Sequence, residues 1–132
     1  MTRTALICFV ALIFLLLGLV TRGICPADRA YEKLWYRVLV HNTIFAITIV
    51  FVSSLSKIAG ILITSIVVGF AAFTCGRALI CGSLSAFLVA LLEANAYIVA
   101  YILANKKKHK IIFGFIMFML LLTASLLETG VI

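Results

Sequence analysis

The sequence predicts an all-α fold, a polytopic transmembrane helical bundle of about five spans that forms a single transmembrane domain over residues 1–132. Three observations predict it: 66% of the residues are hydrophobic, only 11% are charged, and the apolar runs are separated by short polar connections. A soluble domain has about 45–50% apolar and about 25% charged residues. Because small water-soluble domains leave much of their area exposed, a chain of this composition is expected in lipid.

Each apolar run has roughly the 17–25 residues needed to cross about 30 Å of hydrocarbon. Backbone polar groups must be satisfied within the segment in lipid, which predicts helices, and the alternation typical of membrane barrels is absent. The first run is longer than the apolar part of a signal peptide, so we expect an uncleaved span. The fourth run is the longest and is expected to tilt. The predicted spans are 4–21, 38–55, 58–76, 79–104 and 111–127.

The strongly polar stretch after the first span predicts a short interfacial helix over residues 26–37. Pro26 and Asp28 favour a helix start. Tyr31 and Trp35 then fall on one apolar stripe, at the depth of the lipid headgroups. An ordinary solvated loop is the alternative.

The basic residues predict the orientation and the lipid contacts. Cytoplasmic loops carry the Lys/Arg excess, so we expect the N-terminus and the 106–110 loop to be cytoplasmic, in the plasma membrane. The balance is narrow, with six Lys and Arg inside against five outside. The lysines of this loop are expected to contact anionic membrane lipids, or else a cytosolic partner such as an ATPase subunit. They are Lys106, Lys107, Lys108 and Lys110.

The formal net charge of +7 does not indicate nucleic-acid binding, because the basic residues do not gather on one water-facing surface. No catalytic constellation, metal-ligand spacing or cofactor motif is recognisable, and His41 and His109 are expected at opposite ends of the bundle. The sequence therefore predicts a non-enzymatic protein with no cofactor and no metal. Cys25 can form an exterior disulfide if its loop and the Cys75–Cys81 region share the outer face, but the spacing favours unpaired cysteines.

Glu93 is the most informative polar residue, because it falls near mid-membrane in the fourth span. An acidic group at that depth costs about 2.5–3.5 kcal/mol on insertion scales, so it is expected to face protein or water. Its candidate partners are Arg77, His41, Asn42 and Tyr97, or a group on another subunit. A proton or substrate relay and a helix-locking hydrogen bond are both possible roles. Glu128 is expected only to mark the final interface.

Two stripes of small residues predict close helix packing. We expect them to face each other within one helical hairpin formed by the third and fourth spans. The first stripe consists of Ser65, Gly69, Ala72 and Gly76, and the second of Ala86, Ala90 and Ala94.

Two short motifs resemble those of the stage II sporulation protein M family, over roughly residues 38–128. The family pattern Asn-Gly-x-x-x-Gly corresponds here to residues 75–80, and His-Gly-x-x-Glu-x-x-Ala to residues 89–96. Gly76, Glu93 and Ala96 match. The other motif positions differ, since Cys75, Ile80, Val89 and Ala90 stand where the family has Asn, Gly, His and Gly.

The head of the second span, His41-Asn42, also resembles the family at that position. The resemblance implies a non-enzymatic membrane protein that works with cell-wall-remodelling proteins or accompanies an ABC-type ATPase in export. Of the family's polar site, only Glu93 carries over.

We therefore expect a non-catalytic membrane component of a multi-subunit or homo-oligomeric complex, related to export or to the cell envelope. The alternative is a small transporter or channel, with a pore between subunits that Glu93 lines.

Overall fold

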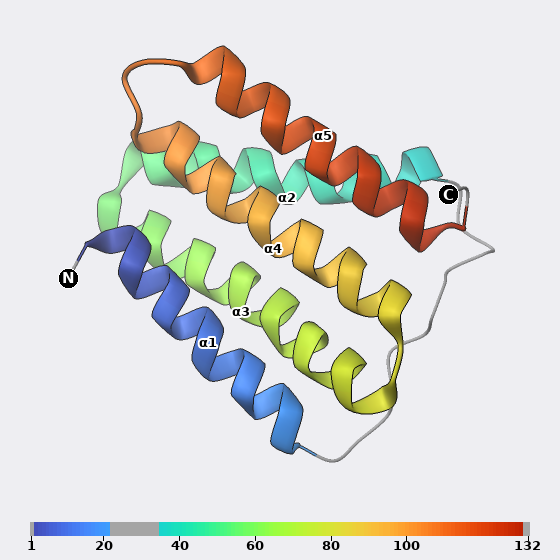
Figure 1. The fold of residues 1–132 in the computed structure, drawn as a ribbon. Helices are drawn as coiled ribbons and strands as arrows, with labels where there is room; N and C mark the ends of the chain where they lie inside the picture. The colour runs from blue at the N-terminus through green and yellow to red at the C-terminus, as the bar shows by residue number, and fades with distance from the viewer. Residues whose placement is uncertain (1, 22–34, 131–132) are drawn as a thin grey trace.

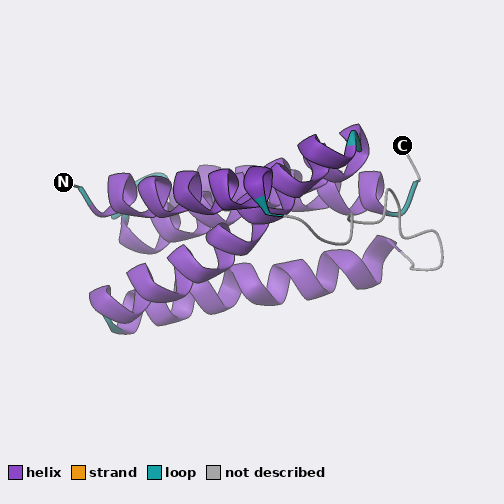
Figure 2. Ribbon diagram, turned by 90° about the horizontal axis from the view of Figure 1, so that it is seen from below, coloured by secondary structure: helices purple, strands orange, loops and turns teal. Residues whose placement is uncertain are grey.

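The computed structural model describes residues 2–21 and 35–130 of the chain. The helices are α1 (Arg3–Val20), α2 (Trp35–Leu55), α3 (Lys57–Cys81), α4 (Leu84–Asn105) and α5 (Lys110–Glu128). All five are long and apolar enough to cross a membrane. Within the described ranges the other residues form short connections and no strand, as Figure 2 shows. The prediction of an all-α, multi-pass bundle is confirmed.

The helices are arranged as a row with one helix behind it. In Figure 1, α1, α3, α4 and α5 run side by side, and α2 crosses behind the row, packed against α3, α4 and α5. The N-terminus, the α2–α3 connection and the α4–α5 connection share one end of the bundle. The α3–α4 turn and the end of α5 lie at the other, which we call the α3–α4 end.

The turn between α3 and α4 lies five residues later than predicted. α3 continues to Cys81, and Gly82 then takes the left-handed conformation, with φ 72°. The backbone N–H of Ser83 donates to Ala78 at 2.9 Å and that of Gly82 to Leu79 at 3.3 Å, which is a Schellman ending. The Ser83 hydroxyl then caps α4 by accepting from the Ala86 N–H. The placement of Arg77 in this connection was wrong, because Arg77 lies inside α3.

α2 begins at Trp35, three residues before the predicted span, so Trp35 and Tyr36 are its exposed first residues. The rest of the interfacial helix predicted over 26–37 lies outside the described residues.

α1 and α3 approach each other through glycine. A Cβ added to Gly76 would overlap the carbonyl oxygen of Leu15, and one added to Gly18 would overlap that of Phe73. Gly69 lies against the ring of Phe14 in the same interface. Contacts this close need residues without a side chain. The expectation that the stripe of Gly69 and Gly76 packs on the fourth span was therefore wrong, because both glycines face α1.

α2 and α3 touch closely at the end where they are connected. A Cβ on Gly60 would meet the Cα and the side chain of Ser53, at 2.6 Å from the hydroxyl oxygen. Ser53 and Gly60 flank the Ser56 cap of α3, whose hydroxyl accepts from the Ala59 N–H. This contact closes the α2–α3 hairpin at its connected end.

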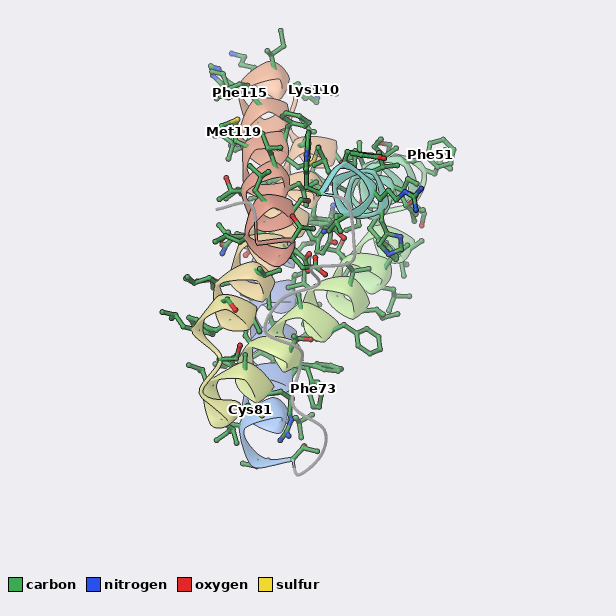
Figure 3. All side chains as sticks on the ribbon, turned by 90° about the vertical axis from the view of Figure 1, so that its right-hand side faces the viewer. Phe51, Phe73, Cys81, Lys110, Phe115 and Met119 are labelled. Atoms are coloured by element: carbon green, nitrogen blue, oxygen red, sulfur yellow. The ribbon has the colours of Figure 1, made fainter. Side chains whose placement is uncertain are left out.

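The outward surface of the bundle is apolar, as expected of helices in lipid. Figure 3 shows large side chains such as Phe51 and Phe115 pointing away from the helices. They are 63% and 65% exposed. The buried core between the helices includes Ile49, Val68 and Leu121. An apolar exterior around a small core indicates that acyl chains, not water, surround the bundle.

The cysteines are of two kinds. Cys81 is disulfide-bonded, whereas Cys8 and Cys75 are free. Cys25, which the sequence offered as a disulfide partner, lies outside the described residues.

Candidate functional site

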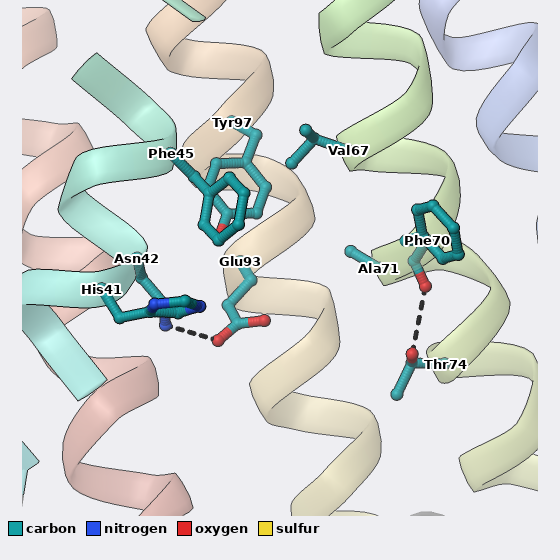
Figure 4. Close-up of a pocket in the computed structure, with 9 residues that line it drawn as sticks. All are labelled: His41, Asn42, Phe45, Val67, Phe70, Ala71, Thr74, Glu93 and Tyr97. Atoms are coloured by element: carbon teal, nitrogen blue, oxygen red, sulfur yellow. Dashed lines mark hydrogen bonds between the residues drawn. The ribbon is translucent and has the colours of Figure 1, made fainter. Parts of the chain in front are cut away.

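A pocket with a cavity volume of about 330 Å³ lies between α2, α3 and α4. Figure 4 shows α2 on one side, α3 on the other, and α4 between them carrying Glu93 and Tyr97. The pocket combines polar and aromatic side chains within a membrane-spanning bundle. Its lining consists of His41, Asn42 and Phe45 from α2, of Val67, Phe70, Ala71 and Thr74 from α3, and of Glu93 and Tyr97 from α4.

The register of the α2–α3 hairpin explains why these residues meet. Asn42 lies 11 residues before Ser53, and Ala71 lies 11 residues after Gly60, so the antiparallel pair brings them to one level. The two helices touch at the Ser53–Gly60 contact, and a cavity separates them at Asn42 and Ala71. The α2–α3 hairpin is therefore tightly packed at its connected end, and the pocket lies between the two helices farther from that connection.

Glu93 accepts a hydrogen bond from the side-chain amide of Asn42, with 2.6 Å between Nδ2 and Oε1. Glu93 lies nine residues after the start of α4 and twelve before its end, near the middle of the span. Asn42 is buried, with 6% of its surface exposed. The carboxyl is thus turned toward protein, and Asn42 is the partner among the candidates that sequence analysis left open.

The second carboxyl oxygen of Glu93 points toward α3 in Figure 4 and has no hydrogen-bond partner among the described residues. The hydroxyl of Tyr97 is likewise without a hydrogen bond in the described part of the chain, although Tyr97 is only 4% exposed. At the side of the pocket, the ring of His41 makes an edge-to-face contact with Phe45, at 5.0 Å between centroids. The pocket therefore contains hydrogen-bonding capacity that these residues leave unused.

A second acidic group lies near the site. Glu128, at the end of α5, is close enough to Glu93 for the two carboxyl groups to interact electrostatically, and both interact with Tyr97. Sequence analysis assigned Glu128 only to the interface, because its proximity to Glu93 depends on how α5 packs on α4. The short α4–α5 connection was the signal that could have revealed it.

Arg77 belongs to a different contact. Its guanidinium donates to the backbone carbonyl of Thr21, which follows the last turn of α1, and the side chain is 7% exposed. Helix C-terminal carbonyls have no partner within their own helix, and a cation stabilises that end of the helix dipole. Arg77 therefore ties α3 to the end of α1 at the α3–α4 end.

The lysine-rich loop lies at the opposite end of the bundle from Arg77. Lys106 places its ammonium 5.4 Å from the centre of the Phe113 ring on α5. Lys107, Lys108 and Lys110 are exposed. Arg3 and Lys57 lie at the same end, as the sequence predicted.

Five pocket residues were not predicted from the sequence, because they are ordinary members of apolar spans until the register is known. They are Phe45, Val67, Phe70, Ala71 and Thr74.

The site and the fold define a multi-pass α-helical membrane protein with an intramembrane polar pocket. Comparison with known protein families, curated proteins and solved structures finds no match for this chain. The resemblance to the stage II sporulation protein M family stays a prediction.

Proposed function

We propose that this protein is a non-catalytic membrane component that assembles with itself or with other membrane subunits. The observation that supports the proposal is the half-buried carboxyl of Glu93 in a pocket that opens between α2 and α3. A polar group left to acyl chains at mid-membrane is unfavourable by about 2.5–3.5 kcal/mol, so a neighbouring protein surface is the natural cover.

The shape of the bundle supports the same proposal. Four of the described helices form a row with α2 behind it, and none of these helices covers the outer side of the pocket. Helices in lipid associate through close packing and hydrogen bonds, and both small residues and polar groups are present here. The stage II sporulation protein M resemblance adds export or cell-envelope complexes as the setting, with an ABC-type ATPase or cell-wall-remodelling proteins as partners.

The orientation is part of the proposal. The end with Arg3, Lys57 and the 106–110 loop faces the cytoplasm of the cell membrane, because basic residues are retained there. The disulfide-bonded Cys81 then lies at the exterior end, where an oxidising compartment preserves such a bond.

The test is the mass of the particle extracted in mild detergent, measured by light scattering or native mass spectrometry. The proposal expects more than one chain per particle in the wild type. Glu93→Gln is expected to shift it toward smaller particles. The matched control is Asn95→Ala, on the same helix, whose exposed side chain bonds only to Leu91 of its own helix. A strictly monomeric wild type with no copurifying chain would contradict the proposal.

A second candidate is a small transporter or channel with its pore between subunits. The observation that favours it is the electrostatic proximity of Glu128 to Glu93, which places two acidic groups near one pocket. Acidic side chains within membrane-spanning segments mark the pathways of protons and ions. Ion flux into liposomes that depends on Glu93, and is lost in Glu93→Gln, would support this function. Equal flux in both proteins, or none in either, would remove it.

A further inference from the structure

Three features of the pocket describe its occupant: a carboxyl group, aromatic residues in the lining and oxygens that make no hydrogen bond. Glu93 contributes the only carboxyl of the lining, and one of its oxygens remains without a partner among the described residues. Tyr97 contributes a hydroxyl that makes no hydrogen bond in the same part of the chain. Both oxygens belong to residues that line the pocket, so a molecule bound there could form hydrogen bonds with them.

The ionisable side chains of the pocket indicate the charge of a molecule that would bind there. Among the described lining residues there is no lysine or arginine, and His41 is the one basic side chain. Glu128, at the end of α5, is a second carboxyl group close enough to interact with Glu93. A cation therefore complements these carboxyl groups better than an anion does.

The aromatic residues of the lining indicate which kind of cation would bind. Phe45, Phe70 and Tyr97 line the cavity, and aromatic faces attract ammonium groups within about 6 Å of the ring centre. A metal ion fits poorly, since no group of three or more His, Cys, Asp or Glu within residues 2–21 and 35–130 could hold one. A cavity of about 330 Å³ also exceeds what a bare ion fills, and it suits an organic molecule.

We propose that the pocket between α2, α3 and α4 binds a lipophilic organic cation, with the ammonium group beside Glu93 and the apolar part against Phe45 and Phe70. The Tyr97 hydroxyl lines the same cavity, and its oxygen can accept a hydrogen bond from an N–H of the ammonium group. This inference goes beyond the proposed assembly function, because it concerns what fills the pocket and not what covers it.

The test uses the purified protein in lipid nanodiscs and benzylammonium, whose N–H groups can donate to Glu93 and Tyr97, as the probe, with binding measured by calorimetry. Ethylbenzene, which has nearly the same shape without the charge, is the matched control ligand. The proposal expects saturable binding of the cation, and binding of the neutral compound weaker by about tenfold. Equal binding of the two compounds, or no binding of the cation, would overturn it.

Variants locate the binding. Glu93→Gln keeps the size of the side chain and removes its charge, and it is expected to weaken the cation by about tenfold. Tyr97→Phe removes one hydroxyl and is expected to weaken it by about threefold. Tyr97→Phe keeps the test decisive if Glu93→Gln fails to fold. Unchanged affinity in every folded variant of the two would contradict the assigned site.

Control measurements separate this inference from the assembly proposal. Asn95→Ala, outside the pocket lining, is expected to bind like the wild type. The number of chains per particle is measured in the same samples. A monomer that binds the cation would overturn the assembly proposal alone, and an oligomer that does not bind it would overturn the ligand proposal alone.

Discussion

The two sides of α3 differ in how they meet their neighbours. Toward α1 the contact is backbone against backbone, through Gly18 and Gly76. Toward α2 the helices touch at Ser53 and Gly60 and then leave the polar pocket between them. Small residues form the first interface, whereas a pocket lined by residues such as Asn42 and Thr74 separates the helices in part of the second one. The difference shows that one helix, α3, can form a closely packed interface on one side and line a polar pocket on the other.

The largest effect is expected from a substitution in the closely packed interface between α1 and α3. Gly76→Ala places a methyl group against the Leu15 carbonyl, so α1 must move away from α3. We expect a loss of about 3 kcal/mol in the free energy of unfolding, the upper range for overpacking. The measurement is unfolding in mixed micelles followed by circular dichroism.

The matched control is Gly114→Ala on α5, where an added Cβ meets nothing within 4 Å. This variant is expected to be as stable as the wild type, or more stable by up to about 1 kcal/mol, because alanine favours helices. Equal destabilisation by both variants would show that α1 and α3 are not closely packed at Gly76.

Arg77→Leu tests the hydrogen bond that joins α3 to the end of α1. It removes the guanidinium that donates to Thr21, and a hydrogen bond to a charged group contributes roughly 1.5–3 kcal/mol. We expect a loss of about 2 kcal/mol in the same unfolding assay. Arg37→Leu, at an exposed position near the start of α2, should have little effect. The reverse order would mean that Arg77 is not part of this contact.

The pocket side is tested by Asn42→Leu, which removes the donor to Glu93. Hydrogen bonds between helices in membranes contribute about 1 kcal/mol, so a loss of that size is expected. Asn95→Leu serves as the control on α4, because Asn95 bonds to its own helix. If both variants lose the same stability, the Asn42–Glu93 bond does not join α2 to α4.

The smallest effect has the opposite sign. Thr64 is fully buried on α3, and its hydroxyl has no hydrogen-bond partner among the described residues. Thr64→Val keeps the shape and removes the unpaired group, so we expect a gain of up to about 1 kcal/mol. Thr48→Val, which loses a hydroxyl bonded to Ile44, should give no gain. A clear loss of stability in Thr64→Val would indicate a partner for that hydroxyl.

Local patterns were sufficient to predict the elements, because apolar length and short connections specify spans. The Gly82-Ser83 pair shows where they were not, since the apolar run hid a turn that depends on one left-handed glycine. Glu93 was identified correctly as the polar residue turned toward protein, because an acid in lipid is unfavourable. Its partner could not be chosen from Arg77, His41, Asn42 and Tyr97, because that choice depends on helix register.

The packing of the small-residue stripes was the other limit. Glycines at helical spacing predict a close contact but not which helix makes it, and here α1 takes the place expected for α4. Glu128 illustrates the same limit, since its distance from Glu93 is set by the packing of α5 on α4.

The most direct test of the account is the environment of the Glu93 carboxyl in a bilayer. Solid-state NMR on protein labelled at asparagine nitrogen and glutamate carbon can detect the 2.6 Å contact between the Asn42 amide and that carboxyl. The account predicts a cross-peak between these two groups that disappears in Asn42→Leu. A carboxyl that shows contacts only to lipid acyl chains would contradict it.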